Sequence, residues 1–518
     1  MRVVTEKDAA RLTGQLAHWA YNALDCCTTA GVLEALLPSL TSGTARTYAF
    51  ERACQAPAMA MMRRGILVDV RARAIAIKRV TRELRGQLAG LNQLPVVADV
   101  WDGTELNTGK CRKATRKDGR HKWPLRMPDA ERKCVDCGRH RICASPFNAA
   151  SWQQTWHLLY DLHNIPKQKN KKRVFSVDEE CLDRIARKYP QVRDLALGIV
   201  AAKGMSKQLG FLRSELSRSG RMMSTFNVGT AWTGRWSSSK DPYKRGTNIQ
   251  NIAEKNRMIF IADPGMKLGY FDLSQSDSRV AAYDAEDEAY IAAHETGNVH
   301  VVAARMFWPE LDWTGDDARD KKLAKSWPLP WHPDLMYYDQ SKRNQHGLNF
   351  GLSPQGLAMQ SHQPLAEAER AYDRFFAWAP RLKARQRQVI AEVKETAVLT
   401  NPLGRRCQFF GMRDDPHTAK QGLSFTPQST TTDVLDIALW HIWNDLDPDR
   451  LHLLAQVHDA ILFQFPEEDE EGITREVLAR MEIAVPMRGG RTMMIPVEPS
   501  TGKNWGKYHK ENNPNGMR

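Results

Sequence analysis

Two isolated aspartates, each attached to a short apolar run, constrain the fold of this chain more than any other feature. Residues 267–271 alternate as a β-strand does and end at Asp272, after which a helix-like pattern begins. Asp459 lies between the apolar runs 453–457 and 461–465, where a tight hairpin would turn. Each Asp taken alone is compatible with an ordinary helix cap or turn residue. If the fold brings them together, the two carboxylates could hold a pair of Mg²⁺ ions for in-line phosphoryl transfer.

The overall charge indicates a polyanionic partner. The 518 residues carry a formal net charge of +14, and nucleic acid is the simplest polyanion that such a chain would bind. The length predicts roughly three to four domains. Neither secretion nor a membrane-spanning segment is expected, because the chain has no signal-like N-terminus and no run of about 18 apolar residues. Nine cysteines, an odd number, favour a reducing, cytoplasmic setting over a disulfide framework.

The spacing of apolar residues switches between helix-like and strand-like stretches along the chain. Helices are predicted over residues 5–40, 47–64, 70 to about 91, 149–163, 178–216, 280–307 and 364–398, and strands over 65–69, 258–261 and 267–273, with a hairpin over 453–465. Residues 101–145 are rich in Lys, Arg, Gly and Cys with little periodicity, so we interpret them as an insertion.

The segments around the two aspartates resemble motifs A and C of the family A DNA polymerases, the lineage of bacterial polymerase I and phage replicative enzymes. Residues 272–279 are similar to the motif A pattern Asp-Tyr-Ser-Gln-x-Glu-x-Arg, and residues 456–459 to the Gln-Val-His-Asp of motif C. Other similarities follow in the family's order, at residues 233–239, 248–252, 298–300, 402–406, 427–433 and 502–505. The resemblance covers residues 45–518 without the cysteine-rich insertion.

The family's motif B, Arg-x3-Lys-x3-Phe-Gly-x2-Tyr-Gly, aligns without a gap with Tyr338-x3-Lys342-x3-His346-Gly-x2-Phe350-Gly. Spacings of four predict that these side chains share one helix face and line an incoming nucleotide from triphosphate to base. Lys342 occupies the family's lysine position, where it would neutralise charge and donate a proton to pyrophosphate. The family's arginine is absent at position 338, so its phosphate contact is either lost or supplied elsewhere, with Arg343 as a nearby candidate.

The resemblance also implies roles for individual residues. Two Mg²⁺ ions would be held by Asp272, Asp459 and the main-chain carbonyl of Leu273, and Asp272, Asp459 and Lys342 would be the catalytic groups. The implied nucleotide-binding residues are Gln275, Asp277, Arg279, His300, Lys342, His346 and Phe350, and the implied DNA contacts are Arg235, Gln250, Asn251, Arg406, Gln428 and His458. For Arg279 and His300, an ordinary ion pair and a structural histidine remain open alternatives.

Two positions depart from the family's motifs. Asp277 stands where the family has Glu beneath the sugar, so selection against a 2'-hydroxyl is either looser or maintained by a neighbour. Ala460 replaces the Glu that follows the aspartate of motif C, which removes an auxiliary carboxylate but leaves the two main ones. We therefore expect reduced dependence on that group and retained activity.

The resemblance implies an α+β fold shaped like a right hand, with an antiparallel palm sheet, helical fingers and thumb, and a short helical N-terminal segment. The expected divisions are residues 1–45 as a remnant of an exonuclease-like domain or a linker, 46–225 as the thumb region with its insertion, 226–290 as the first part of the palm, 291–400 as the fingers and 401–518 as the second part of the palm. Tyr21 and Asp25 have the Tyr-x3-Asp spacing of a proofreading exonuclease. No Asp-x-Glu strand precedes them, so a complete 3'-5' exonuclease domain is not expected.

The insertion contains four cysteines that could ligate a metal: Cys111, Cys134, Cys137 and Cys143. They form one Cys-x2-Cys knuckle with two outlying thiols, whereas two knuckles would be the stronger zinc signal. Structural Zn²⁺ and a flexible basic loop with free thiols both remain open. In either case the surrounding Lys and Arg residues would contact DNA.

The implied function is template-directed DNA synthesis, in which dNTPs extend the 3'-hydroxyl of a primer on primer-template DNA, in phage replication and hence in the host cytoplasm. A separate proofreading exonuclease or processivity factor would be a further partner. The alternatives are a single-subunit RNA polymerase-like enzyme and a non-catalytic relative that only binds primer-template DNA. Asp277 and the His458-Asp459 pair favour DNA synthesis over RNA synthesis, and Lys342 favours catalysis.

Overall fold

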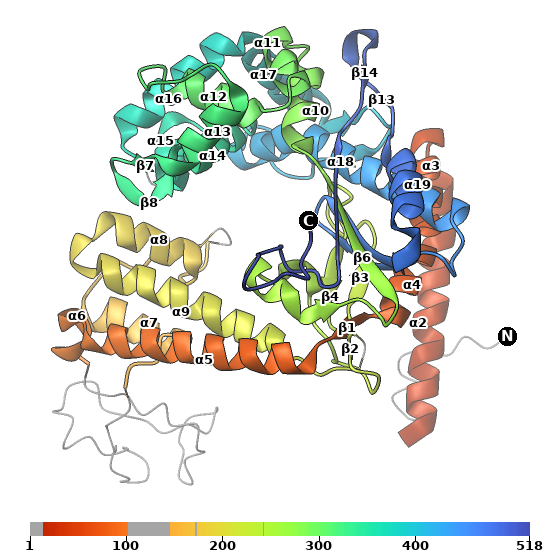
Figure 1. The fold of residues 1–518 in the computed structure, drawn as a ribbon, viewed down its shortest axis with the longest axis horizontal. Helices are drawn as coiled ribbons and strands as arrows, with labels where there is room; N and C mark the ends of the chain where they lie inside the picture. Colours follow the sequence, from red (N-terminus) through yellow and green to blue (C-terminus); the bar gives the residue numbers. More distant parts are fainter. Residues whose placement is uncertain (1–13, 102–145, 171–172, 242, 362) are drawn as a thin grey trace.

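The computed structural model describes residues 14–101, 146–170, 173–241, 243–361 and 363–518. Its main sheet is antiparallel, with the strand order β11–β12–β6–β15, and is formed by His452–Val457, Ala460–Pro466, Met266–Leu273 and Val497–Gly502. Figure 1 labels β6 within this sheet. β11 and β12 are buried along almost their whole length, which matches their nearly continuous apolar sequences. β6 pairs with β12 on one side and β15 on the other, so the end that carries Asp272 is fixed from both sides.

Helices cover this sheet and complete its core. α18 (Pro416–Asp445) and α19 (Glu470–Met481) pack against β12, and α4 (Gln55–Arg64) packs against β11. Within the core, the rings of Phe271 and Phe463 meet edge to face with centroids 5.0 Å apart. The sheet is therefore a rigid platform for the residues at its edge.

A large helical group lies beyond the end of β6, at the upper left of Figure 1. It comprises α10 (Ser276–Asp284), α11 (Glu288–Glu295), α12 (Val299–Phe307), α13 (Asp317–Ser326), the hairpin β7 (Pro328–Leu329) and β8 (His332–Met336), α14 (Tyr337–Asn349), α15 (Pro354–Ser361), α16 (Leu365–Trp378) and α17 (Pro380–Thr396). Buried aromatic rings, including Tyr290, Phe307 and Phe375, pack against one another in its interior. These contacts hold α12 and α14 in place beside the sheet edge.

A second helical group lies at the lower left of Figure 1 and has its own hydrophobic cluster. It comprises α5 (Val70–Gln93), α6 (Pro95–Ala98), α7 (Trp152–Trp156), the π-helix η3 (His157–Leu162), α8 (Glu179–Lys188) and α9 (Arg193–Leu212). α5 begins at Asp69, whose side chain accepts hydrogen bonds from the backbone N–H groups of Arg71 and Ala72. Leu158, Leu182 and Ile199 are fully buried in the cluster.

The remaining elements are short, apart from the N-terminal helices. They are α2 (Gly14–Leu36), α3 (Ser42–Ala53), the sheet β2–β1–β5 (Arg221–Met222, Ile66–Val68, Phe260–Ile261), the pairs β3–β4 (Thr225–Asn227, Ser237–Ser239), β9–β10 (Val398–Thr400, Arg406–Gln408) and β13–β14 (Val485–Pro486, Thr492–Met493), and the 3-10 helices Leu37–Ser39, Pro190–Val192, Ile249–Asn251, Glu254–Ile259, Glu467–Asp469 and Arg488–Gly490. Tyr21 and Asp25 are exposed on α2. Among the helices that the structure describes, none has both the length and the apolar character needed to cross a bilayer.

Several helix predictions need correction, and one site prediction lies outside the described residues. The stretches predicted as helices over 47–64, 178–216 and 364–398 are each interrupted. The single helix predicted over residues 280–307 is three helices, because Asp287 caps α11 and Gly297, with a φ of +98°, ends it before α12. Apolar spacing alone did not reveal these polar and glycine interruptions. The four cysteines of the insertion lie outside the described residues, so the zinc prediction stays a prediction.

Candidate active site

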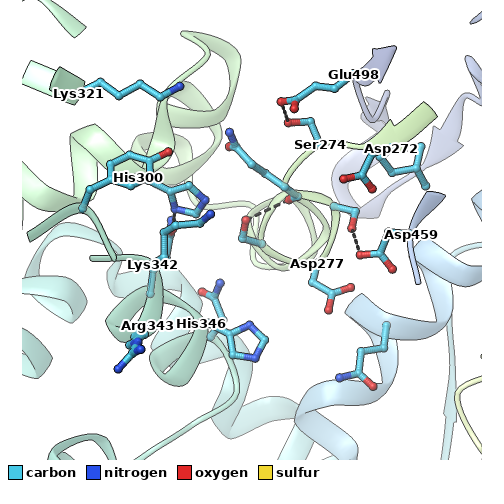
Figure 2. Close-up of a pocket in the computed structure, with 18 of the residues that line it drawn as sticks. Asp272, Ser274, Asp277, His300, Lys321, Lys342, Arg343, His346, Asp459 and Glu498 are labelled. Carbon is cyan, nitrogen blue, oxygen red and sulfur yellow. Dashed lines mark hydrogen bonds between the residues drawn. The ribbon is translucent and has the colours of Figure 1, made fainter. Parts of the chain in front are cut away.

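A cavity of about 1070 Å³ lies between the edge of the central sheet and helices α13 and α14. Its two sides differ in charge (Figure 2). Asp272, Asp277, Asp459 and Glu498 lie on one side, and Lys321, His300, Lys342, Arg343 and His346 lie on the other. A ligand that spans both sides would therefore need one part that binds the carboxylates through bound cations and one anionic part that binds the basic side chains.

The two aspartates predicted from the sequence line this one cavity. Asp272 pairs across the sheet with Ala460, the residue that follows Asp459, and the Leu273 N–H donates a hydrogen bond of 3.0 Å to the Asp459 main-chain carbonyl. Ser276 Oγ donates to Asp459 Oδ2 at 3.2 Å. Burial, followed by the charges of Asp459 and Glu498, raises the pKa of Asp272 to about 6. The pKa of Asp459 is also raised, chiefly by burial and then by Asp277.

Both aspartates sit beside residues in the left-handed region of backbone conformation. His458 has a φ of +56° in the β11–β12 turn, and Gln275 has a φ of +54° at the start of α10. Such conformations are unfavourable for residues other than glycine and persist only where the surroundings hold them. Gln456 Nε2 donates to the His458 carbonyl at 2.7 Å, and Gln250 Nε2 donates to Gln456 Oε1 at 2.9 Å. Gln250 thus braces the turn from within the protein.

Arg235 connects two acidic groups at the cavity wall. Its Nη2 lies 3.3 Å from Asp277 Oδ2 and 3.7 Å from Asp459 Oδ1. Thr431 Oγ1 donates a hydrogen bond of 3.1 Å to Asp277 Oδ1. The Asp277 carboxylate is therefore held by two partners, and the guanidinium opposes the rise in the pKa of Asp459.

On the basic side, Lys342 is exposed to the cavity, whereas His300 is held in place by hydrogen bonds. Lys342 Nζ lies 5.7 Å from the centre of the Tyr338 ring. His300 Nδ1 donates to Gln345 Oε1 at 2.6 Å, and Ser341 Oγ donates to the His300 carbonyl at 2.8 Å. Burial, then the charge of Lys342, lowers the pKa of His300 to about 4, so its ring is neutral at pH 7.

The structure brings some of the predicted residues into the cavity and leaves others outside it. Those that line the cavity are Arg235, Asp272, Leu273, Gln275, Asp277, His300, Lys342, His346, Gln428 and Asp459. Those that do not are Gln250, Asn251, Arg279, Phe350, Arg406 and His458. Asn251 and Arg406 are exposed elsewhere on the surface, and His458 is exposed at its turn.

Arg279 and Phe350 differ most from their expected positions. Arg279 is buried, with its guanidinium paired to Glu295 and donating at 2.8 Å to the His294 carbonyl, which is the ion-pair alternative. Phe350 is the residue that ends α14 after Asn349, and it does not line the cavity. Its ring instead meets that of His346 edge to face, with centroids 4.8 Å apart.

Sequence reasoning missed several residues that line the cavity, notably Lys321, Lys325, Glu498 and Lys507. The spacing of four between Lys321 and Lys325 was a usable signal, since it predicts a shared helix face just before motif B. The sequence around Glu498 gives no signal that it belongs to the site. It lies opposite Asp272 only because β15 pairs with β6.

The acidic side suits a hard divalent cation such as Mg²⁺. Asp272 and Asp459 offer carboxylate oxygens, and each disfavours the ionised form of its neighbour, a repulsion that a bound cation would relieve. The part of the chain that the structure describes contains no cluster of three or more His, Cys, Asp or Glu side chains arranged as a complete metal site. The remaining ligands of an ion would therefore be main-chain oxygens, water or substrate, as is usual for Mg²⁺.

Comparison with known proteins identifies the family. The profile described as DNA polymerase family A matches residues 129–327 and 336–507, which is more than half of the chain. This chain belongs to DNA polymerase family A. The family match is interrupted at residues 328–335, within the β7–β8 hairpin that precedes motif B.

Individual members of the family resemble the chain at a moderate level. DNA polymerase I of Treponema pallidum (strain Nichols) is 27% identical over 386 residues, which cover 71% of this chain and 36% of the relative. DNA polymerase I of Geobacillus stearothermophilus is 26% identical over 387 residues, which cover 71% of this chain and 40% of the relative. The chain thus spans less than half the length of these family A relatives.

A solved structure shows the same fold. The polymerase domain of Pol1 from M. smegmatis, in a complex with DNA primer-template and dNTP, superposes with a TM-score of 0.63 at 21% identity, covering 88% of this chain and 70% of that chain. The fold is therefore the α+β right hand of family A, with an antiparallel palm sheet and helical fingers and thumb, as the sequence motifs predicted.

Proposed function

We propose that this family A chain is a template-directed DNA polymerase, which extends the 3'-hydroxyl of a primer with dNTPs. The observation that carries the proposal is that Asp272 and Asp459, from two distant parts of the sequence, line one cavity opposite Lys342. The family match supports it, and the solved relative from M. smegmatis is described in complex with primer-template DNA and dNTP.

In this proposal, Asp272, Asp459 and the main-chain carbonyl of Leu273 hold two Mg²⁺ ions. When bound, such ions lower the pKa of the attacking 3'-hydroxyl and neutralise the departing pyrophosphate. The 3'-hydroxyl releases its proton to solvent water, a bond forms between the 3'-oxygen and the α-phosphorus, and the bond from the α-phosphorus to the bridging oxygen of the β-phosphate breaks. Lys342 neutralises charge on the leaving pyrophosphate and donates a proton to it.

Other residues orient the nucleotide and exclude the wrong sugar. Asp277, held by Arg235 and Thr431, is fixed in position beside the metal-binding carboxylates, and we infer that it limits access of a 2'-hydroxyl. His346, which contacts Phe350 edge to face, offers a flat surface for the base. Gln275 and His300 also line the cavity.

The wider roles in the proposal follow the same family resemblance. Residues 46–225 form the thumb region, 226–290 and 401–518 form the palm, and 291–400 form the fingers. Gln428 and Arg235 contact DNA from the cavity, and Asn251, Arg406 and His458 contact it from exposed positions outside the cavity. The enzyme acts in phage replication in the host cytoplasm.

Substitution of one metal-binding aspartate tests the proposal. We expect Asp459→Asn to reduce single-nucleotide incorporation on a primer-template by at least about 10³-fold, while primer-template binding persists. Asp449→Asn is the matched control, because Asp449 is exposed in the loop before β11 and lies outside the cavity. Incorporation is measured with Mg²⁺ and either dNTPs or rNTPs.

Each outcome of this experiment favours one hypothesis. Incorporation of dNTPs by the unmodified chain and its loss in Asp459→Asn support the proposal. A preference for rNTPs supports the RNA polymerase alternative. Primer-template binding without any incorporation supports the non-catalytic alternative, and an Asp459→Asn variant as active as Asp449→Asn rules out the assigned site.

A further inference from the structure

The basic side of the cavity contains two lysines that motif B does not supply. Lys321 and Lys325 both lie on α13 and both line the cavity. Their spacing of four residues puts them on one face of the helix. Figure 2 shows Lys321 extending toward the space between His300 and the acidic side.

The neighbouring face of α13, one residue before each lysine, anchors the helix and thereby fixes the position of the lysine face at the cavity. Asp320 is fully buried and accepts hydrogen bonds from Arg305 Nε at 2.6 Å and from the Thr314 N–H at 2.8 Å. Ala324 is also fully buried, in a small cluster with Val301 and Tyr338. Lys321 and Lys325, one position further along the helix, lie about 100° around it from this anchor and line the cavity.

Two ammonium groups converge on one aromatic ring. Lys325 Nζ lies 5.0 Å from the centre of the Tyr338 ring, and Lys342 Nζ lies 5.7 Å from it. Within the described residues, none of Lys321, Lys325 and Lys342 forms an ion pair with a carboxylate. Like charges gathered without counter-charges repel each other, and a polyanion placed among them would remove that repulsion.

The position of these lysines corresponds to the cation that motif B lacks at position 338. Tyr338 occupies the place where the motif has arginine, so α14 itself offers Lys342 but no cation one turn earlier. Lys325 reaches over the same ring from the neighbouring helix. His300 does not supply the charge, because it is neutral at pH 7.

We propose that Lys325, assisted by Lys321, binds the β- and γ-phosphates of the incoming nucleoside triphosphate and replaces the cation that is absent at position 338. The inference rests on the proposed function and names a specific part of its substrate. The triphosphate would extend from the carboxylates of the palm to the lysines of α13 and α14, which is the arrangement that the opposite charges of the two cavity sides favour.

The test compares Lys325→Ala with Lys325→Arg and with the control Lys322→Ala. Lys322 is exposed on the same helix and does not line the cavity. We expect Lys325→Ala to raise the KM for dNTP by about 10-fold, with kcat and the Kd for primer-template each within about twofold of the unmodified chain. Lys325→Arg retains the charge and should restore KM to within about threefold. Lys322→Ala should change none of these quantities.

A second measurement needs no catalysis. Tripolyphosphate serves as a probe of the proposed site for the β- and γ-phosphates. Its Kd is measured by displacement of a fluorescent nucleoside triphosphate from the complex of the protein with primer-template. We expect Lys325→Ala to weaken tripolyphosphate binding by about 10-fold and Lys322→Ala to leave it unchanged.

The outcomes separate this inference from the proposed function. If the unmodified chain incorporates dNTPs but Lys325→Ala matches Lys322→Ala in both KM and tripolyphosphate binding, the assignment of Lys325 is wrong and the polymerase proposal stands. If the unmodified chain incorporates no nucleotide, the polymerase proposal fails. In that case, loss of tripolyphosphate binding in Lys325→Ala would still support a polyphosphate site at α13.

Discussion

The surroundings of Asp272 show how a motif can lose one carboxylate and keep an acidic site. On β12, the residue paired with Asp272 is Ala460, which is fully buried and offers no charge. On β15, the residue paired with Asp272 is Glu498, whose Oε1 accepts a hydrogen bond of 2.7 Å from Ser274 Oγ. The carboxylate of Glu498 thus lies in the cavity on the strand at the other side of β6. Its charge contributes to the raised pKa of Asp272.

A buried histidine behind the cavity predicts a specific acid sensitivity. Burial, then the charge of Arg279, lowers the pKa of His294 from 6.5 to about 3. Between these two pKa values, His294 is protonated in the unfolded chain and neutral in the folded chain. The free energy of unfolding therefore falls as the pH drops below about 6.5. Between pH 7 and pH 5, His294 alone should lower the free energy of unfolding by about 2 kcal/mol.

The measurement is urea unfolding at pH 7 and pH 5 for the unmodified chain and for His294→Phe. The phenyl ring should pack well, because His294 already lies against Tyr290 with ring centroids 5.2 Å apart and neither ring nitrogen has a partner among the described residues. We expect the loss of stability from pH 7 to pH 5 to be about 2 kcal/mol smaller in His294→Phe. Exposed His417, changed to Gln, is the control, and equal losses in all three proteins would contradict the prediction.

β6 contains a glycine, Gly269, that leaves room for the ring of Phe463 on β12. An added Cβ at Gly269 would lie 2.4 Å from Cζ of Phe463, which is fully buried against Phe271. We expect Gly269→Ala to lower the free energy of unfolding by about 1–3 kcal/mol, because the strand or the ring must shift. Denaturant unfolding followed by tryptophan fluorescence measures the change.

The control for this substitution is Gly204→Ala on α9. An added Cβ at Gly204 meets no atom within 4 Å, so alanine there should be neutral or stabilising by up to about 1 kcal/mol. Gly269→Ala as stable as Gly204→Ala would show that the β6–β12 contact is more adaptable than the structure indicates.

The elements that carry the two aspartates were predictable because their signals are local. Alternation in β6 and the apolar runs of the β11–β12 hairpin define the strands, and the motifs fix their identity. The lysine face of α13 and Glu498 were not predicted, because their roles depend on how distant elements pack. The sequence left a nucleotide contact and an ion pair open for Arg279 for the same reason, since sequence position does not reveal that its side chain turns inward to Glu295.

The two largest hydrophobic clusters of the described residues form a palm-centred core and a separate helical core around α8 and α9. The insertion leaves and rejoins the chain at the edge of the second core. Trp101, which precedes it, and Phe147, which follows it, meet edge to face with ring centroids 5.2 Å apart. Because the two ends are already in contact, residues 102–145 can be replaced without stretching either flank.

Replacing residues 102–145 with a short Gly-Ser linker therefore separates folding from DNA binding. The melting temperature should stay within about 2 °C, since Trp101 and Phe147 keep their contact. The insertion contributes many of the Lys and Arg residues behind the net charge of +14, so primer-template affinity at 150 mM salt should fall by at least about 10-fold, with a shallower dependence on salt. Incorporation at saturating DNA should stay within about twofold, because the cavity residues are unchanged. A same-length insertion with Lys and Arg changed to Gln is the matched control. If that control binds DNA as the unmodified chain does while the deletion does not, the insertion acts through its length or its cysteines, and the electrostatic explanation is wrong.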